Sequence, residues 1–275
     1  MNLASYKTKS LHGEVTCPGD KSVSQRIVIV GSLLNCDMRV NGFLNAQDPI
    51  STVNALNSIG SSISINGNEL ILKKREVMFK DPEKVLNLGN SGTGARLLLG
   101  LISGLGLRSS ITGDSSLSKR PMNRIIEPLK MMGARLSSNK GMLPISTQGS
   151  KIINNFEYEM PIASAQVKSC LLLTAMSAKK NIKITEPKIT RDHTERMIDF
   201  FGGNIAYGNN KNSRLIELNY SELEPKDTFN VPGDFSSASF IIVATIISKD
   251  SEVLIKNVGL NAVSYTHLRA HETSL

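Results

Sequence analysis

The segment Pro18-Gly19-Asp20-Lys21-Ser22-Val23-Ser24-Gln25-Arg26 predicts a turn that leads directly into a helix. Pro-Gly marks the turn, and Asp20 is suited to cap a helix that begins at Lys21 or Ser22. Ser22 and Arg26 are four residues apart and share one helix face. Lys21 stands at the helix start, where free N–H groups and the positive dipole end also point. The segment fits either a phosphate or carboxylate site or a capped surface helix with solvated cations.

This helix start is the first of four similar segments, which recur with a period of about 70 residues. The others combine small or turn-forming residues before an apolar run, and they are Gly89-Asn90-Ser91-Gly92, Pro161-Ile162-Ala163-Ser164 and Gly233-Asp234-Phe235-Ser236. A second helix is predicted after each of the first three starts, at 48–59, 121–132 and 190–201, and each ends at glycine. Runs rich in β-branched residues predict the strands between them, and Asn66-Gly67 predicts a hairpin turn. We therefore expect an α/β fold in which three βαβαββ units bury their helices against one another.

The repeat also preserves a pairing of residue types. In the first three units a small residue near the helix start is followed four positions later by a cation: Ser22 and Arg26, Gly92 and Arg96, Ser164 and Lys168. The fourth unit breaks the rule, because Phe240 follows Ser236. One helical position could favour a long side chain with a solvated tip. The three parallel occurrences favour the alternative, in which three helix starts face a common anionic ligand.

Composition narrows the class of partner. The chain has 275 residues, enough for one large or two ordinary domains, and a formal net charge of +8 that favours anionic partners. Lysine and arginine are dispersed, aromatic residues make up 5% and tryptophan is absent, which disfavours a nucleic-acid binder. No apolar run is long enough for a membrane helix, and we expect a cytoplasmic protein. The three widely spaced cysteines predict reduced thiols and no zinc site.

Further candidate residues lie at the starts of the second helices. Arg120 precedes Pro121, which is suited to the first helical position, so Arg120 is held extended and could point at a ligand. Arg191 has the equivalent position in the third unit, and Asp48 has it in the first. The glycine-rich loop at residues 89–96 matches no nucleotide-binding pattern, although its glycines permit close approach of an anion to the backbone.

The histidines do not indicate a metal or a general base. His193 has no partner in the sequence, which favours a structural role. His267 and His271 have the spacing of a helical metal pair, but they lie in a C-terminal tail that we do not expect to belong to the fold.

Six segments together resemble the enolpyruvyl transferases of the shikimate pathway, the 5-enolpyruvylshikimate-3-phosphate synthase family. They follow the family's order across residues 13–260 and read PGDKSVSQR (18–26), LGNSGTGAR (88–96), GDSSLSKRPMNRIIEP (113–128), PIASAQVKSCLLL (161–173), TRDHTERM (190–197) and VPGDFSSAS (231–239). The resemblance implies two lobes, each of three units. Residues 1–17 and 229–261 would belong to an incomplete first lobe, and 18–228 would form the second, with units at about 18–80, 81–150 and 151–228. Residues 262–275 match nothing in the family, and we expect a non-native tail.

The family joins the enolpyruvyl group of phosphoenolpyruvate to the 5-hydroxyl of shikimate 3-phosphate and releases phosphate, without metal or organic cofactor. The resemblance therefore implies these two small-molecule partners, no nucleic acid, no membrane and a monomer at full length. The implied roles fall on matching positions: Lys21 contacts both substrates and assists proton transfer, Ser22 and Arg26 bind shikimate 3-phosphate, the Gly92 backbone and Arg120 hold phosphoenolpyruvate, Ser164 and Ala165 line the shikimate phosphate pocket, Gln166 touches both ligands, and Arg191 reaches the phosphate.

Two alternatives to an active enzyme of this family remain at this point. Asp48 and Arg96 would support the binding residues from behind, but no Asp or Glu matches the family's general acid/base pair. We therefore expect the chain alone to be inactive, and a non-catalytic anion-binding fragment is one alternative. The other is the enolpyruvyl transferase acting on UDP-N-acetylglucosamine, disfavoured because the loop at 113–120 lacks its cysteine.

Overall fold

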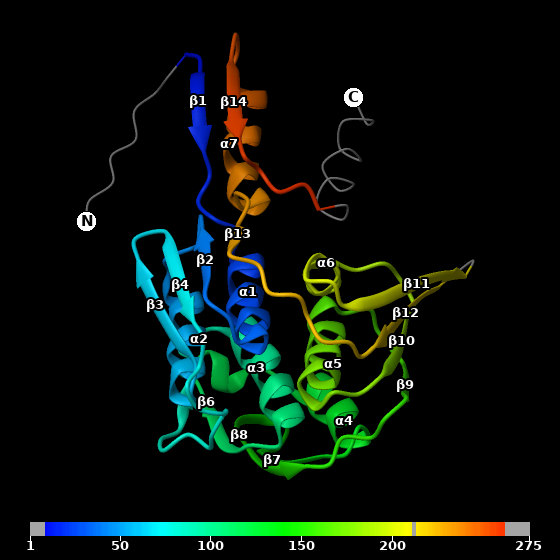
Figure 1. Cartoon of the computed structure of the whole chain (residues 1–275). Helices are drawn as coiled ribbons and strands as arrows, with labels where there is room; N and C mark the ends of the chain where they lie inside the picture. Colours follow the sequence, from blue (N-terminus) through cyan, green and yellow to red (C-terminus); the bar gives the residue numbers. More distant parts are fainter. Residues whose placement is uncertain (1–8, 211–212, 262–275) are drawn as a thin grey trace.

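Three buried helices of equal length form the centre of the fold. The computed structural model describes residues 9–210 and 213–261. Within it α1 (Lys21–Leu34), α3 (Gly92–Leu105) and α5 (Ala165–Ala178), each of 14 residues, run through the middle of the main body, with sheets around them (Figure 1). This arrangement confirms the expected α/β fold with helices packed against one another and sheets outside.

Three four-stranded sheets repeat one topology. The first joins β13 (Thr228–Asn230), β2 (Met38–Asn41), β4 (Glu69–Lys73) and β3 (Ser62–Asn66) in that order. The second has β5 (Leu86–Asn87), β6 (Arg108–Thr112), β8 (Met142–Ser150) and β7 (Ala134–Asn139), and the third has β9 (Phe156–Glu159), β10 (Ile182–Glu186), β12 (Ser213–Asn219) and β11 (Asn204–Asn210). In each sheet the first pair is parallel and the other two pairs are antiparallel.

The first sheet takes its leading strand from far along the chain. Strand β13 pairs with β2 as β5 pairs with β6, so the boundary expected at 228/229 falls inside β13. The more N-terminal strand β1 (His12–Thr16) instead pairs with β14 (Glu252–Lys256), and with α7 (Phe235–Ile247) these strands stand apart from the main body (Figure 1). The two connections between these parts run side by side, because Gly19 bridges Gly233.

The second helix of each unit is shorter than the first. These helices are α2 (Gln47–Ser58), α4 (Asn123–Met131) and α6 (His193–Phe200). The predicted start of α2 is within one residue, and α4 begins at Asn123, two residues after the predicted start at Pro121. Helix α6 begins three residues later than predicted, because the Glu186 carboxylate accepts hydrogen bonds from Thr190.

Close contact between α3 and α5 depends on two glycines. A Cβ atom at Gly100 would lie 2.5 Å from the carbonyl oxygen of Cys170, and one at Gly104 would lie 2.4 Å from that of Thr174. Only glycine permits this approach, which also lets the Thr174 hydroxyl donate to the Gly100 carbonyl at 3.1 Å. The helices are thereby fixed in register, and so are their N-terminal ends.

Other local predictions have mixed outcomes. The hairpin turn is confirmed, since Asn66 pairs with Glu69 and Gly67 has a φ of +59°. All three cysteines are free thiols, although Cys36 is only half-buried. Among the described helices none is both long and apolar enough to cross a membrane. The predicted tail at 262–275, with His267 and His271, lies outside the described residues.

Candidate functional site

The N-terminal ends of α1, α3 and α5 are capped but carry no acidic first turn. Asp20, Ser91 and Ser164 each accept a hydrogen bond from the backbone N–H three residues later, at 2.9, 3.1 and 3.4 Å. Acidic side chains favour a helix N-terminus, and α2 and α6 have Asp48 and Glu195 there. The first turns of the three central helices contain none. The positive dipole ends of α3 and α5, which have serine caps, are therefore left for an outside anion, whereas the carboxylates of Asp20 and Asp234 already face the start of α1.

Side-chain hydrogen bonds bring the three helix starts together. Each bond joins a different pair of helices: Gln25 to Ser91 (2.5 Å), Gln166 to Thr93 (2.9 Å) and Arg26 to Ser169 (3.1 Å). The starts thus occupy one region of the main body, as the repeat predicted. The predicted site residues in this region divide between two hollows and a ridge.

The first hollow unites three of the predicted residues. Lys21, Ser22 and Arg191 line a cavity of about 410 Å³ between the start of α1 and the start of α7. The Nζ atom of Lys21 lies 3.5 Å from the carboxylate of Asp48, and its backbone N–H donates to Asp234 (3.2 Å). A cation from α1 and a cation from the segment before α6 therefore share one space with the carboxylates of Asp20 and Asp234.

The second hollow lies at the start of α5. Ser164 and Gln166 line about 220 Å³ together with Arg96 and Arg124, and none of its described lining residues is acidic. Burial lowers the pKa of Arg96, and the nearby charges of Arg120 and Arg124 lower it further. The hollow is therefore cationic. Arg124 was not predicted, and it lies in the first turn of α4.

Gly92 and Arg120 form the ridge beside the second hollow. A Cβ atom on Gly92 would lie 3.0 Å from Nη1 of Arg96 and 3.1 Å from Nη1 of Arg120, so both guanidinium groups rest against the start of α3. Arg120 also donates to the side chains of Asn90 and Ser116. The backbone N–H of Gly92 donates to the carbonyl of Asn90 (2.9 Å). Ala165 is half-buried and is the first residue of α5.

Arg26 points into the protein interior. It is 3% exposed, its Nε donates to Thr194 (2.8 Å), and its Nη1 donates to the carbonyl of Ser22 (3.0 Å). Burial lowers the pKa of Arg26 to about 10, against the nearby carboxylates of Glu195 and Asp20, which raise it. The Nη1 atom of Arg26, which donates to the Ser22 carbonyl, is the part of the side chain that connects to the first hollow through Ser22.

Lys168 corrects the prediction that three equivalent cations face one ligand. Its side chain is fully buried, and its Nζ lies 3.0 Å from Glu186 Oε2 and 2.7 Å from Glu195 Oε1. The two carboxylates, which come from β10 and α6, draw the ammonium group inward, so Lys168 lines neither hollow. Neither glutamate was singled out from the sequence, because nothing in the sequence pattern around them marks burial.

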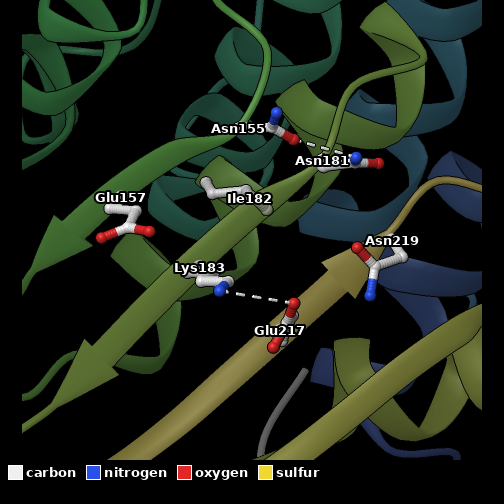
Figure 2. A pocket seen from close by; sticks show the side chains of 7 residues that line it. All are labelled: Asn155, Glu157, Asn181, Ile182, Lys183, Glu217 and Asn219. Carbon is white, nitrogen blue, oxygen red and sulfur yellow. Dashed lines mark hydrogen bonds and ion pairs between the residues drawn. The ribbon is translucent and has the colours of Figure 1, made fainter.

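A third hollow has a different character. It covers about 320 Å³ on the third sheet, and Figure 2 shows side chains of both charge signs and amides around it. The salt bridge from Lys183 to Glu217 (3.6 Å) crosses it, and none of the predicted site residues is among its lining residues Asn155, Glu157, Asn181, Ile182, Lys183, Glu217 and Asn219. Its lining has two carboxylates against one ammonium group and includes no residue from the start of a central helix, so it is a poor candidate for an anion site.

His193 lies close to the first hollow but does not take part in a metal cluster. In the described ranges, no three His, Cys, Asp or Glu side chains are grouped so that they could hold a metal ion. Burial is the main cause that lowers the pKa of His193, and Arg26 and Arg191 lower it further, while Asp20 and Asp192 oppose them.

His193→Gln is expected to reduce the acid sensitivity of the fold. Because the folded-state pKa lies below the ordinary value of about 6.5, the unfolded chain binds more protons as the pH falls through this interval, and stability is lost. The neutral glutamine cannot titrate, so the variant should lose less stability than the wild type between pH 7.5 and the lowered pKa. Urea unfolding at several pH values measures this, and parallel curves for the two proteins would contradict it.

The architecture is that of an α/β protein with three repeated units, in which the central helix starts gather beside two hollows that are lined by lysine and arginine side chains among other residues. The family model for EPSP synthase (3-phosphoshikimate 1-carboxyvinyltransferase) matches residues 5–272, and the chain belongs to this family.

Named relatives and solved structures agree with the family assignment. A 3-phosphoshikimate 1-carboxyvinyltransferase from Petrotoga mobilis is 46% identical over 95% of this chain and 61% of its own length, and one from Legionella pneumophila strain Lens is 42% identical over 95% and 60%. The EPSP synthase structure from Acinetobacter baumannii has a TM-score of 0.82 and 36% identity, covering 96% of this chain and 60% of that one. The chain thus spans about three fifths of the length of the relatives it matches.

Proposed function

We propose that the chain binds shikimate 3-phosphate and phosphoenolpyruvate as part of a 3-phosphoshikimate 1-carboxyvinyltransferase. The observation that carries the proposal is the gathering of three helix starts without acidic first turns beside Lys21, Arg191, Arg96 and Arg120. Two phosphates and two carboxylates must come together in this reaction. Helix dipoles and fixed cations offset the repulsion between them and stabilise charge that develops in the transition state.

The proposed roles follow the two hollows and the ridge. Lys21 contacts both substrates while the 5-hydroxyl oxygen attacks C2 of phosphoenolpyruvate and C3 gains a proton. Loss of phosphate from the tetrahedral intermediate then completes the transfer. Shikimate 3-phosphate is held by side chains at the starts of α1 and α5 and before α6, and the ridge holds phosphoenolpyruvate. The residues assigned to the two substrates are Lys21, Ser22, Arg26, Ser164, Ala165, Gln166 and Arg191 for shikimate 3-phosphate, and Lys21, Gly92, Arg120 and Gln166 for phosphoenolpyruvate.

We further propose that residues 18–228 form one lobe with β13 completing its first sheet, and that β1, α7 and β14 belong to the other. Relatives contain substantially more chain, since the match covers 61% of the Petrotoga mobilis protein. We accordingly expect substrate binding without turnover from this chain alone. The dispersed cations and few aromatic residues argue against a nucleic-acid partner, and the proposal includes a cytoplasmic enzyme that is monomeric at full length.

Titration calorimetry with shikimate 3-phosphate tests the proposal. Binding is expected, and shikimate without its phosphate should bind at least about tenfold more weakly, because a phosphate adds charge-assisted hydrogen bonds. The same titration with UDP-N-acetylglucosamine tests the alternative family member. Absence of heat with shikimate 3-phosphate, or tighter binding of the sugar nucleotide, would contradict the proposal. Phosphate release above background with both substrates would overturn the expectation of no turnover.

A further inference from the structure

A buried ionic cluster lies behind the two hollows. It consists of Lys168 on α5, Glu186 at the end of β10 and Glu195 on α6, and the three side chains are fully buried. Lys168 Nζ donates to both Glu186 oxygens at 3.1 and 3.0 Å, and it lies 2.7 Å from Glu195 Oε1. The Lys168 ammonium group is therefore shared between the two carboxylates. The cluster ties three elements of the third unit together.

Arg26 supplies the second positive charge near this cluster. Lys168 alone would leave one carboxylate without a compensating charge, and the charge of Glu195 acts on Arg26 from α6. Arg26 reaches α6 through Thr194 (2.8 Å) and α5 through Ser169 (3.1 Å). Burying charges is costly, and apolar residues of similar volume often give equal or higher stability. Stability alone therefore does not explain four charged side chains at this place.

Hydrogen bonds between Glu186 and Thr190 connect the cluster to the first hollow. Besides Lys168, Glu186 binds Thr190, whose hydroxyl donates to Oε2 at 2.7 Å and whose backbone N–H donates to Oε1 at 3.4 Å. Thr190 immediately precedes Arg191, which lines the hollow with Lys21 and Ser22. The segment 187–192 is not helical and includes exposed residues, so this carboxylate is an anchor for the backbone that carries Arg191.

We propose that Glu186 and Thr190 are positioning residues that hold Arg191 against the phosphate of shikimate 3-phosphate. This inference rests on the proposed function. Lys168 lies four residues after Ser164, so its bonds to Glu186 connect the Arg191 segment with the first turn of α5. The buried bonds between Lys168 and Glu186 thereby fix the spacing between Arg191 and the start of α5 at Ser164–Gln166. Two groups that would bind one phosphate are held at a fixed separation before the ligand arrives.

The variant Thr190→Val tests the anchor, because it removes the hydroxyl and keeps the side-chain shape. Thr190→Ser restores the hydroxyl, and Thr185→Val is the matched control on β10, at the half-buried position before the buried Glu186. Thr190→Val should bind shikimate 3-phosphate about tenfold more weakly, as expected for a misplaced binding group. Thr190→Ser and Thr185→Val should bind as the wild type does, and thermal unfolding checks that all three are folded.

A double-mutant cycle with Arg191→Ala separates positioning from general damage. If Thr190 acts through Arg191, Thr190→Val should cause no further loss of affinity once Arg191 is alanine. A loss in that background as large as in the wild type would overturn the proposal, and so would unchanged affinity of the single variant Thr190→Val.

Amide hydrogen exchange provides a readout without ligand. Exchange across residues 188–192 should rise in Thr190→Val and return to the wild-type rate in Thr190→Ser. If the wild type does not bind shikimate 3-phosphate, the proposed function fails while exchange still reports the anchor. If the wild type binds and exchange in Thr190→Val is unchanged, the anchor is overturned and the proposed function stands.

Discussion

Lys168→Met should lower the free energy of unfolding by about 3–5 kcal/mol, as expected when one partner of a buried ion pair is removed. Methionine fills most of the volume of lysine, so the loss reports charge and not a cavity. Glu186 and Glu195, both fully buried, would then face each other without the ammonium group between them. Urea unfolding followed by circular dichroism at pH 7 measures the change.

The control is Lys183→Met, which removes a lysine from the surface of the third sheet (Figure 2). Its pair with Glu217 is longer, at 3.6 Å, and the two side chains are 46% and 32% exposed. Solvent screens such a pair, so the loss should be about 0–1 kcal/mol. Equal losses in the two variants would contradict the interpretation that burial makes the Lys168 pairs decisive.

The same comparison has a pH signature. Burial raises the pKa of the Glu195 carboxyl, and Lys168 is the main group that opposes this rise. Without Lys168 the folded protein holds a proton on Glu195 more tightly than the unfolded chain does, so stability increases as the pH falls. The deficit of Lys168→Met relative to the wild type should therefore shrink below neutral pH. A constant deficit between pH 7.5 and pH 5 would contradict this account.

Features set by local chemistry could be predicted from the sequence. The cap at Asp20 and the turn at Gly67 depend on residues within a few positions of each other, and the structure has them where the sequence indicated. The repeat then predicted that the helix starts would gather, because equivalent segments in stacked units have equivalent places.

Long-range pairing limited the rest. Strand β13 completes the first sheet through hydrogen bonds between Thr228–Asn230 and a strand almost 190 residues earlier, from Arg39↔Thr228 to Asn41↔Asn230. The two residues of each pair are about 189 positions apart in the sequence, and periodicity within a short window cannot indicate such a pairing. The late start of α6 has a local origin instead, since Thr190 bonds to the Glu186 carboxylate only four residues earlier, in a place where the sequence pattern indicated a helix.

Identical spacing also led to different environments. Arg96 and Lys168 both follow a small residue by four positions, yet Arg96 lines a hollow and Lys168 is buried between two carboxylates. The difference comes from Glu186 and Glu195. Neither the four-residue spacing nor the sequence around Lys168 indicates that these two carboxylates lie beside it. The position of a helix start could be predicted, but the direction of a long side chain depended on residues that the fold brings to it.

Lys21→Met should weaken the binding of shikimate 3-phosphate by about ten- to a hundredfold, because hydrogen bonds to charged groups contribute about 1.5–3 kcal/mol. Lys21 lines the first hollow with Ser22 and Arg191, and its side chain is 50% exposed. Its pair with Asp48 is long, at 3.5 Å, so the loss of this pair should cost little stability. Calorimetry measures the affinity, and thermal unfolding of the same samples measures stability.

Lys73→Met is the matched control, since Lys73 has a shorter pair with Asp37 (2.9 Å) and a 59% exposed side chain but lines neither of the two hollows at the helix starts. Both variants change the net charge equally, so similar losses of affinity would assign the effect of Lys21 to long-range attraction. A lysine in the first turn of α1 opposes the helix dipole, and methionine there should leave α1 equally or more stable. Weaker binding by a protein of unchanged or higher stability would therefore mean that Lys21 serves the ligand at the expense of its own helix.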